Sequence, residues 1–202
     1  MHTKEHTRGL ILGSLPRGEA SKLVYIFTRD FGLIACHAQG VRKAMGKLKG
    51  FLEPYRYVDV SLVSGKIGWR IVDAHPYALG QTSTRDEDKL KLLARLCVFL
   101  KRFLGEDDPS PRLFDEMLNA LIFLHGADLS GDEQSKFEML AVTLVLYHLG
   151  YLPDKKHFEE RKDFLLPLVE SHLWDKDRLY KIHGRERELV TAINDSFQAS
   201  QL

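Results

Sequence analysis

A basic segment between residues 40 and 55 holds the side chains of this sequence that are best suited to binding an anion. No carboxylate occurs between Asp30 and Glu53, and three glycines interrupt the segment, so it is expected to be a loop or a short helix between two strands. Cations without a local acidic partner on such a link suit a polyanion such as a nucleic-acid backbone. An ordinary solvated basic loop is the alternative. The cations of the segment are Arg42, Lys43, Lys47 and Lys49.

The charge of the chain is divided unevenly along its 202 residues, although the formal net charge is only +1. Residues 1–80 contain twelve lysines and arginines and six acids, a net charge of +6, whereas the remainder has 17 basic and 22 acidic residues, a net charge of −5. Such asymmetry suggests two domains with different roles, of which the first faces an anionic partner.

The hydrophobic pattern changes from strand-like to helical near residue 80. Five short β-branched and aromatic runs are predicted as strands, at 9–14, 21–28, 33–38, 55–63 and 67–72. Their number and size are typical of an oligonucleotide-binding (OB) barrel. Helical spacing follows from about residue 83, with helices predicted to end near residues 105, 126 and 150 and two shorter ones around 174–182 and 186–197. We therefore expect an α+β fold, with a five-stranded OB-fold domain over residues 1–80 and an all-α helical bundle over 81–202.

Catalytic motifs are missing from the sequence. It contains no GxGxxG, no Walker loop, no nucleophile elbow and no HExxH, so we expect neither enzymatic activity nor a cofactor. His148 lies on an apolar helical stretch and is expected to be a core histidine. Cys36 and Cys97 are interpreted as small buried hydrophobes, and no metal site is expected. The absence of a long apolar run and of an apolar signal core predicts a cytoplasmic protein with no membrane span.

Several short motifs, in order, resemble the bacterial recombination mediator family RecO. The first strands and turns of the family are similar to the opening of this sequence, Leu10-Ile-Leu-Gly-Ser-Leu-Pro-Arg-Gly-Glu-Ala-Ser-Lys-Leu-Val-Tyr-Ile-Phe-Thr-Arg-Asp-Phe-Gly-Leu33. The stretches 39–43 and 52–55 are similar to its basic segment and the following Leu-x-Pro-Phe, and 148–154 is similar to its Leu-Gly-Tyr-x-Pro. The resemblance extends over 8–77 and, more loosely, 85–154. Many members continue with a cysteine zinc module, but this chain has no cysteine after Cys97.

The resemblance implies a nucleoid-associated DNA-binding protein that anneals complementary strands without ATP. It further implies binding of single- and double-stranded DNA, and help from the partner RecR in loading RecA recombinase onto strands coated by single-strand binding protein. Two other functions remain open: an OB-fold RNA-binding factor of translation or ribosome assembly, and an interaction scaffold that docks an acidic protein. No membrane partner is expected.

Site residues follow from combining the resemblance with the predicted elements. The four cations of the basic segment are the first candidates for DNA phosphate contacts. The second candidates are Arg17, Lys22, Arg29, Arg56, Lys66 and Arg70. Phe31 and Tyr55, near turns beside the basic segment, are the candidates for base stacking. The helical half is expected to brace the barrel and to receive partners, including the acidic, apolar-ended C-terminal tail of single-strand binding protein. The candidate cations for that contact are Lys91, Arg95, Lys101 and Arg102.

Overall fold

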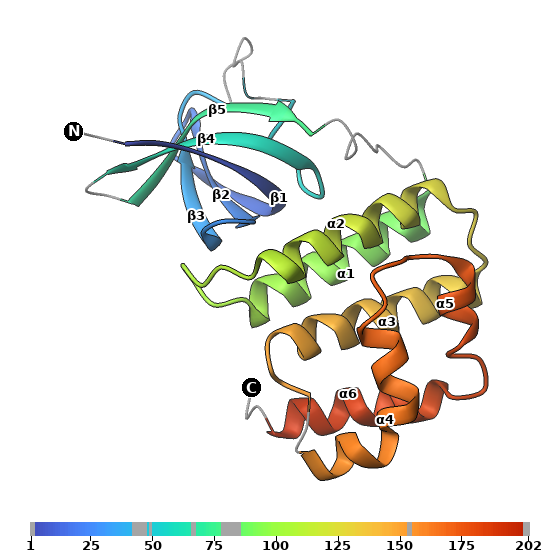
Figure 1. The fold of residues 1–202 in the computed structure, drawn as a ribbon. Coiled ribbons are helices and arrows are strands. Elements are labelled where there is room, and N and C mark those ends of the chain that lie inside the picture. Colours follow the sequence, from blue (N-terminus) through green and yellow to red (C-terminus); the bar gives the residue numbers. More distant parts are fainter. Residues whose placement is uncertain are drawn as a thin grey trace.

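Two structural parts follow one another along the chain in the computed structural model, a β-barrel and a group of helices (Figure 1). The structure describes residues 3–41, 48, 50–65, 68–77, 86–152 and 155–199. The strands are β1 (Lys4–Arg17), β2 (Ser21–Thr28), β3 (Gly32–Ala38), β4 (Tyr57–Gly65) and β5 (Gly68–Pro76). The helices are α1 (Glu87–Phe103), α2 (Pro111–Gly126), α3 (Gly131–His148), α4 (Lys155–Val169), α5 (Lys176–Tyr180) and α6 (Glu186–Ala199).

The five strands close into a barrel in the order β1-β2-β3-β5-β4. The long strand β1 closes it, because its first half pairs with β4 and its second half with β2, with a register irregularity between Ile11 and Gly13. The pairing of β3 with β5 is parallel, and the other strand pairings described in the barrel are antiparallel. Alternate side chains such as Val24, Ile26 and Ile34 fill the interior. The predicted OB-fold barrel followed by helices is confirmed.

The outer face of the barrel joins the helical core. Leu10, Phe27, Leu33 and Tyr57 belong to the same buried cluster as the helices, and the ring of Phe114 on α2 meets Phe27 and Tyr57 edge to face at 5.4 and 5.6 Å. These four barrel residues are direct cross-strand partners, so they form one apolar row across β4, β1, β2 and β3. Burial of this shared row holds the barrel against the helices.

The turn into β3 also fits closely against the helical part. Gly32 has a φ of +67°, and a Cβ at this position would lie 2.3 Å from the carbonyl oxygen of Asp108. The backbone N–H of Asp107 donates to the carbonyl of Leu33. Only glycine combines this left-handed conformation with so close a backbone approach.

Local signals explain where the helices begin. Asp86 caps α1 by accepting from the backbone N–H groups of Asp88 and Lys89, and Ser130 forms a capping box with Glu133 at α3. Helix α3 is central, because it contacts α1, α2, α4, α5 and α6. Gly150, with a φ of +75°, follows its end, as the sequence predicts.

Helix α4 corrects the sequence prediction, which placed only two short helices in the last forty or so residues. The segment begins with a polar run and contains Pro167, features that argue against a helix from sequence alone. Its second half buries Phe164, Leu165 and Leu168 in the helical core. Tertiary burial of this short apolar stretch therefore stabilises a helix that local propensity does not favour.

Candidate nucleic-acid interface

An open band on the outer face of the barrel is the surface best suited to a nucleic-acid strand. Strand register makes Leu15, Leu23, His37 and Arg70 consecutive partners across β1, β2, β3 and β5. Directly opposed side chains share a face of the sheet, about 5 Å apart. Leu15 is 53% exposed, Arg70 is exposed, and Leu23 and His37 are partly exposed. We call these four residues the barrel row.

Cations border the barrel row on two sides. Arg17 lies exposed two residues beyond Leu15 at the end of β1, and Arg70 ends the row on β5. Lys101 reaches the neighbouring position from the last turn of α1, with its Nζ 3.4 Å from the centre of the Tyr25 ring. Within the described residues, the outward positions of β1, β2 and β3 in and beside the row hold no carboxylate. The nearest acids along the chain are Asp73, three residues from Arg70 on β5, and Glu19 in the turn after β1. A strand laid here would find cationic edges for its phosphates and apolar side chains between them; single-strand sites combine a cationic groove with aromatic rings on which bases stack.

The first-choice cations of the sequence prediction, Arg42, Lys43, Lys47 and Lys49, lie outside the described residues, as does Lys66. Their proposed role in phosphate binding stays a prediction.

The other predicted DNA contacts differ in their surroundings. Arg17 and Arg70 lie on or beside the barrel row. Lys22 is 3.7 Å from Glu53, and Arg56 is partly buried, with its carbonyl accepting from the N–H of Ile11.

Arg29 is held by the helical part. Its guanidinium donates to both carboxylate oxygens of Asp115 on α2, at 2.9–3.2 Å, and this hydrogen bonding raises the pKa of Arg29. Arg8 approaches the same carboxylate at 3.8 Å and donates to the hydroxyl of Tyr77. Asp115 therefore already binds the two arginines that face α2, Arg8 and Arg29. These arginines belong to the contact between the barrel and the helices.

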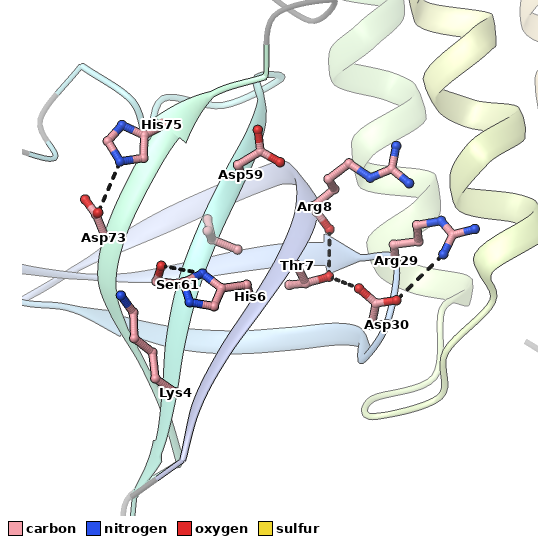
Figure 2. A pocket seen from close by; sticks show the side chains of 11 residues that line it. Lys4, His6, Thr7, Arg8, Arg29, Asp30, Asp59, Ser61, Asp73 and His75 are labelled. Atoms are coloured by element: carbon pink, nitrogen blue, oxygen red, sulfur yellow. Dashed lines mark hydrogen bonds and ion pairs between the residues drawn. The ribbon is translucent and has the colours of Figure 1, made fainter.

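Figure 2 shows a second surface, a shallow cavity of about 460 Å³ where β1, β4 and β5 lie together. Arg8 and Arg29 point from its edge toward the helices. Its other charged groups are Lys4, Asp30, Asp59 and Asp73, with His6 and His75. His75 contacts Asp73 at 3.1 Å and, through a side-chain hydrogen bond, lowers the pKa of that carboxyl. Three cations face three carboxylates, so this cavity is less suited to a polyanion than the barrel row.

The two aromatic candidates for base stacking are both used in packing. The Phe31 ring lies 5.0 Å from the Trp69 ring, against the barrel interior. Tyr55 has a φ of +69° and packs against the helical cluster, and burial raises the pKa of its phenol. Neither ring stands free beside the barrel row, and their role in stacking stays a prediction.

The four candidate cations of α1 separate into different environments. Lys91 pairs with Glu87 and Asp88 on its own helix, whereas Lys101 turns to the barrel. Arg95 and Arg102 line an apolar depression of about 400 Å³ together with Val98, Phe99, Phe103 and Phe197. A second depression of about 350 Å³ shares Phe99 and Phe197 and extends toward α3. Arg95 also makes a bidentate contact of 2.6 Å with Glu138.

A cavity of about 630 Å³ lies between α2, the end of α3 and the end of α4, where His148 and His172 face Glu116 and Asp115. His148 is only partly buried, so the sequence prediction of a core histidine is wrong; it ends α3 at the cavity wall, and burial still lowers its pKa. Within the described ranges, no three histidine, cysteine or acidic side chains are arranged to hold a metal ion. None of the helices described is both long and apolar enough to cross a membrane.

Three residues of the candidate interface were missed from the sequence: Leu15, Leu23 and His37. Alternation along each strand places 15 with 17, and 21 with 23, on common faces. The missing information was the register between strands, which alone joins these positions into one row.

Comparison with known proteins agrees with this architecture. The family described as "Recombination protein O N terminal" matches residues 1–69. The DNA repair protein RecO of Myxococcus xanthus is 31% identical over 146 residues, which cover 71% of this chain and 58% of that protein. The RecO protein of Rubrobacter xylanophilus is 30% identical over 148 residues, which cover 73% of this chain and 58% of that protein. The RecO protein of Photobacterium profundum is 26% identical over 180 residues, which cover 82% of this chain and 74% of that protein. The chain thus spans about three fifths of the first two relatives. Its first 69 residues match the N-terminal family model of recombination protein O, and the longer stretch is similar to the DNA repair protein RecO.

Proposed function

We propose that this chain is a DNA-binding recombination mediator in DNA repair, which binds single strands on the barrel row and anneals complementary strands without ATP. The observation that carries the proposal is the barrel row itself. Exposed Leu15 and partly exposed Leu23 and His37 lie between the cations Arg17, Arg70 and Lys101, and no acid occupies the neighbouring outward positions described on β1, β2 and β3. The relationship to DNA repair protein RecO supports DNA as the polyanion.

Annealing needs no bond chemistry. Two polyanionic strands must be held close together by contacts that are weak enough to let them slide into register. Arginine and lysine side chains neutralise phosphates through salt-sensitive contacts, and apolar side chains tolerate any base. The cations at 42, 43, 47 and 49 are proposed as further phosphate contacts.

The helical part, residues 81–202, is proposed to brace the barrel and to receive partners. The depression beside Arg95 and Arg102 offers phenylalanine rings next to two guanidinium groups, of which that of Arg95 is paired with Glu138. That combination suits the acidic, apolar-ended tail of single-strand binding protein. With RecR, the protein would then help load RecA onto strands coated by single-strand binding protein.

The test is annealing of complementary DNA strands by the purified chain without nucleotide. Replacing Arg17 and Arg70 by alanine is expected to slow annealing strongly, because it removes both arginines that flank the barrel row. Lys181→Ala/Arg187→Ala is the matched control, since it removes two exposed cations from the helical part. The loop variant Arg42→Ala/Lys43→Ala/Lys47→Ala/Lys49→Ala is expected to lose annealing as well.

Absence of annealing in the unmodified chain, or equal rates in the Arg17/Arg70 variant and its control, would refute the proposal. Tighter binding of structured RNA than of DNA would favour an RNA-binding factor. A lack of any nucleic-acid binding at low salt would favour a protein scaffold, because low salt strengthens phosphate contacts.

A further inference from the structure

Tyr25 lies where the barrel row meets the helices. It points outward from β2 in the same sense as Leu23 and Phe27, because the alternate residues Val24 and Ile26 fill the barrel interior. Phe27 is covered by the helical core and Leu23 belongs to the barrel row, so Tyr25 is at the boundary between covered and open surface. Tyr25 is partly buried and, like Tyr55, packs against the helical core cluster.

The flexible side chain of Lys101 covers the Tyr25 ring. The Nζ of Lys101 lies 3.4 Å from the ring centre, whereas Lys101 itself is exposed. No ion pair joins Lys101 to a carboxylate of the described residues. An exposed contact between an ammonium group and an aromatic face is weak. A flat apolar group can therefore replace the ammonium group on the ring at little cost.

The surroundings suit one nucleotide. Ala35, which has a small side chain, is the cross-strand partner of Tyr25 on β3. Leu23 and His37 form the next outward pair. A base stacked on Tyr25 would continue onto these side chains, and its phosphate would lie within reach of the long Lys101 side chain.

We propose that Tyr25 and Lys101 form a binding position for one unpaired nucleotide, in which the base takes the place of the ammonium group on the ring and Lys101 turns to the phosphate. This position rests on the proposed binding of single strands to the barrel row. It assigns stacking to Tyr25, and it makes α1 part of the DNA-binding surface. Paired bases do not expose their faces, so the position selects single strands over duplex.

The two residues predict different changes in the same binding experiment, which uses anisotropy of a labelled oligo(dT) and of a blunt duplex over a range of salt concentrations. Tyr25→Leu should weaken oligo(dT) binding roughly tenfold or more with an unchanged salt slope, and should leave duplex binding unchanged. Tyr25→Phe, which keeps the ring, should bind like the unmodified chain. Lys101→Ala should reduce the magnitude of the single-strand salt slope by about 0.7.

Matched controls come from the helical part. Lys91→Ala removes the same charge from the same helix, but from a lysine already paired with Glu87 and Asp88, so it should leave the salt slope unchanged. Tyr180→Leu removes a 74% exposed ring from α5 and should leave oligo(dT) binding unchanged.

The outcomes separate this position from the proposed function. If the unmodified chain binds oligo(dT) but Tyr25→Leu and Lys101→Ala behave like their controls, the nucleotide position is refuted and the barrel row stands. If the unmodified chain binds no DNA, the proposed function fails and the position fails with it. Should Tyr25→Leu not fold, the salt slope of Lys101→Ala against Lys91→Ala decides alone.

Discussion

Replacing Glu116 by glutamine would test the ion pair that joins α2 to the C-terminal helices. The side chains of Glu116 and Arg178 are both only 2% exposed. One carboxylate oxygen of Glu116 accepts from Arg178 at 3.0 Å and from the indole N–H of Trp174 at 2.8 Å. Arg178 also donates to the carbonyls of Leu168 and Leu173, so it ties the end of α4 to α5. Burial lowers the pKa of this arginine, although Glu116 opposes the effect.

The expected loss follows from this geometry. Glutamine keeps the shape of the side chain and one accepting oxygen, but it removes the carboxylate charge that is hydrogen-bonded to the buried Arg178. Asp175 is then the remaining acid that favours the charged arginine. Breaking a buried pair by removing one partner costs about 3–5 kcal/mol. For a chain of this length, that loss lowers the melting temperature by roughly 6–20 °C. The barrel row is not touched, so DNA binding below the transition should persist.

The measurement is thermal and urea unfolding followed by circular dichroism. Glu138→Gln is the control, because its partner Arg95 is 56% exposed and the pair is bidentate at 2.6 Å. An exposed pair contributes about 1 kcal/mol or less. If Glu116→Gln and Glu138→Gln lower the free energy of unfolding equally, the inference that the buried Glu116–Arg178 pair stabilises the contact between α2 and the C-terminal helices is refuted.

Three further predictions concern the contact between barrel and helices and the buried thiols. Tyr57→Phe should stabilise the fold by about 1 kcal/mol in urea unfolding, because the buried Tyr57 hydroxyl has no hydrogen-bond partner among the described residues; a clear loss of stability would contradict this. Gly32→Ala should cost about 3 kcal/mol, since its Cβ would meet the Asp108 carbonyl at a positive φ, and an unchanged melting temperature would argue against that close approach. Burial raises the pKa values of Cys36 and Cys97 from 9.0 to about 12. The thiols of the unfolded chain ionise at lower pH than those of the native chain. The contribution of the two buried thiols to stability should therefore be fully present below pH 9 and be lost as the pH rises from there toward 12. A thiol reagent should label the two cysteines only when the chain unfolds. Rapid labelling of the native chain at neutral pH would count against this burial.

Local sequence signals predicted much of the fold. Alternating β-branched and aromatic runs predicted five strands, and helical spacing with Gly150 predicted the end of α3. The caps Asp86 and Ser130 are local signals of the same kind, although the predicted helices did not depend on them. These features act over a few residues, so they can be recognised without tertiary structure. Helix α4 was missed because its stability comes from burial of Phe164, Leu165 and Leu168 against other helices, and not from its own polar sequence.

The candidate site was predictable only in part. Arg17 and Arg70 were named as second candidates from their charge, the resemblance and the predicted elements, and the structure places both at the barrel row. Charge could not tell them from Arg29, whose guanidinium is bound by Asp115, 86 residues away in the sequence. It also could not show that Lys101 faces the barrel while Lys91 pairs within its own helix.

By itself, the sequence determined the basic character of the first 80 residues, the barrel and helices, and the family resemblance, because these depend on composition, periodicity and short motifs. Only the tertiary structure decided which cations remain available to an anion and which apolar side chains lie between them. Strand register joins residues 15, 23, 37 and 70 into one row, and helix packing brings Lys101 to Tyr25. Both arise from contacts between residues far apart in the chain, which no local pattern encodes.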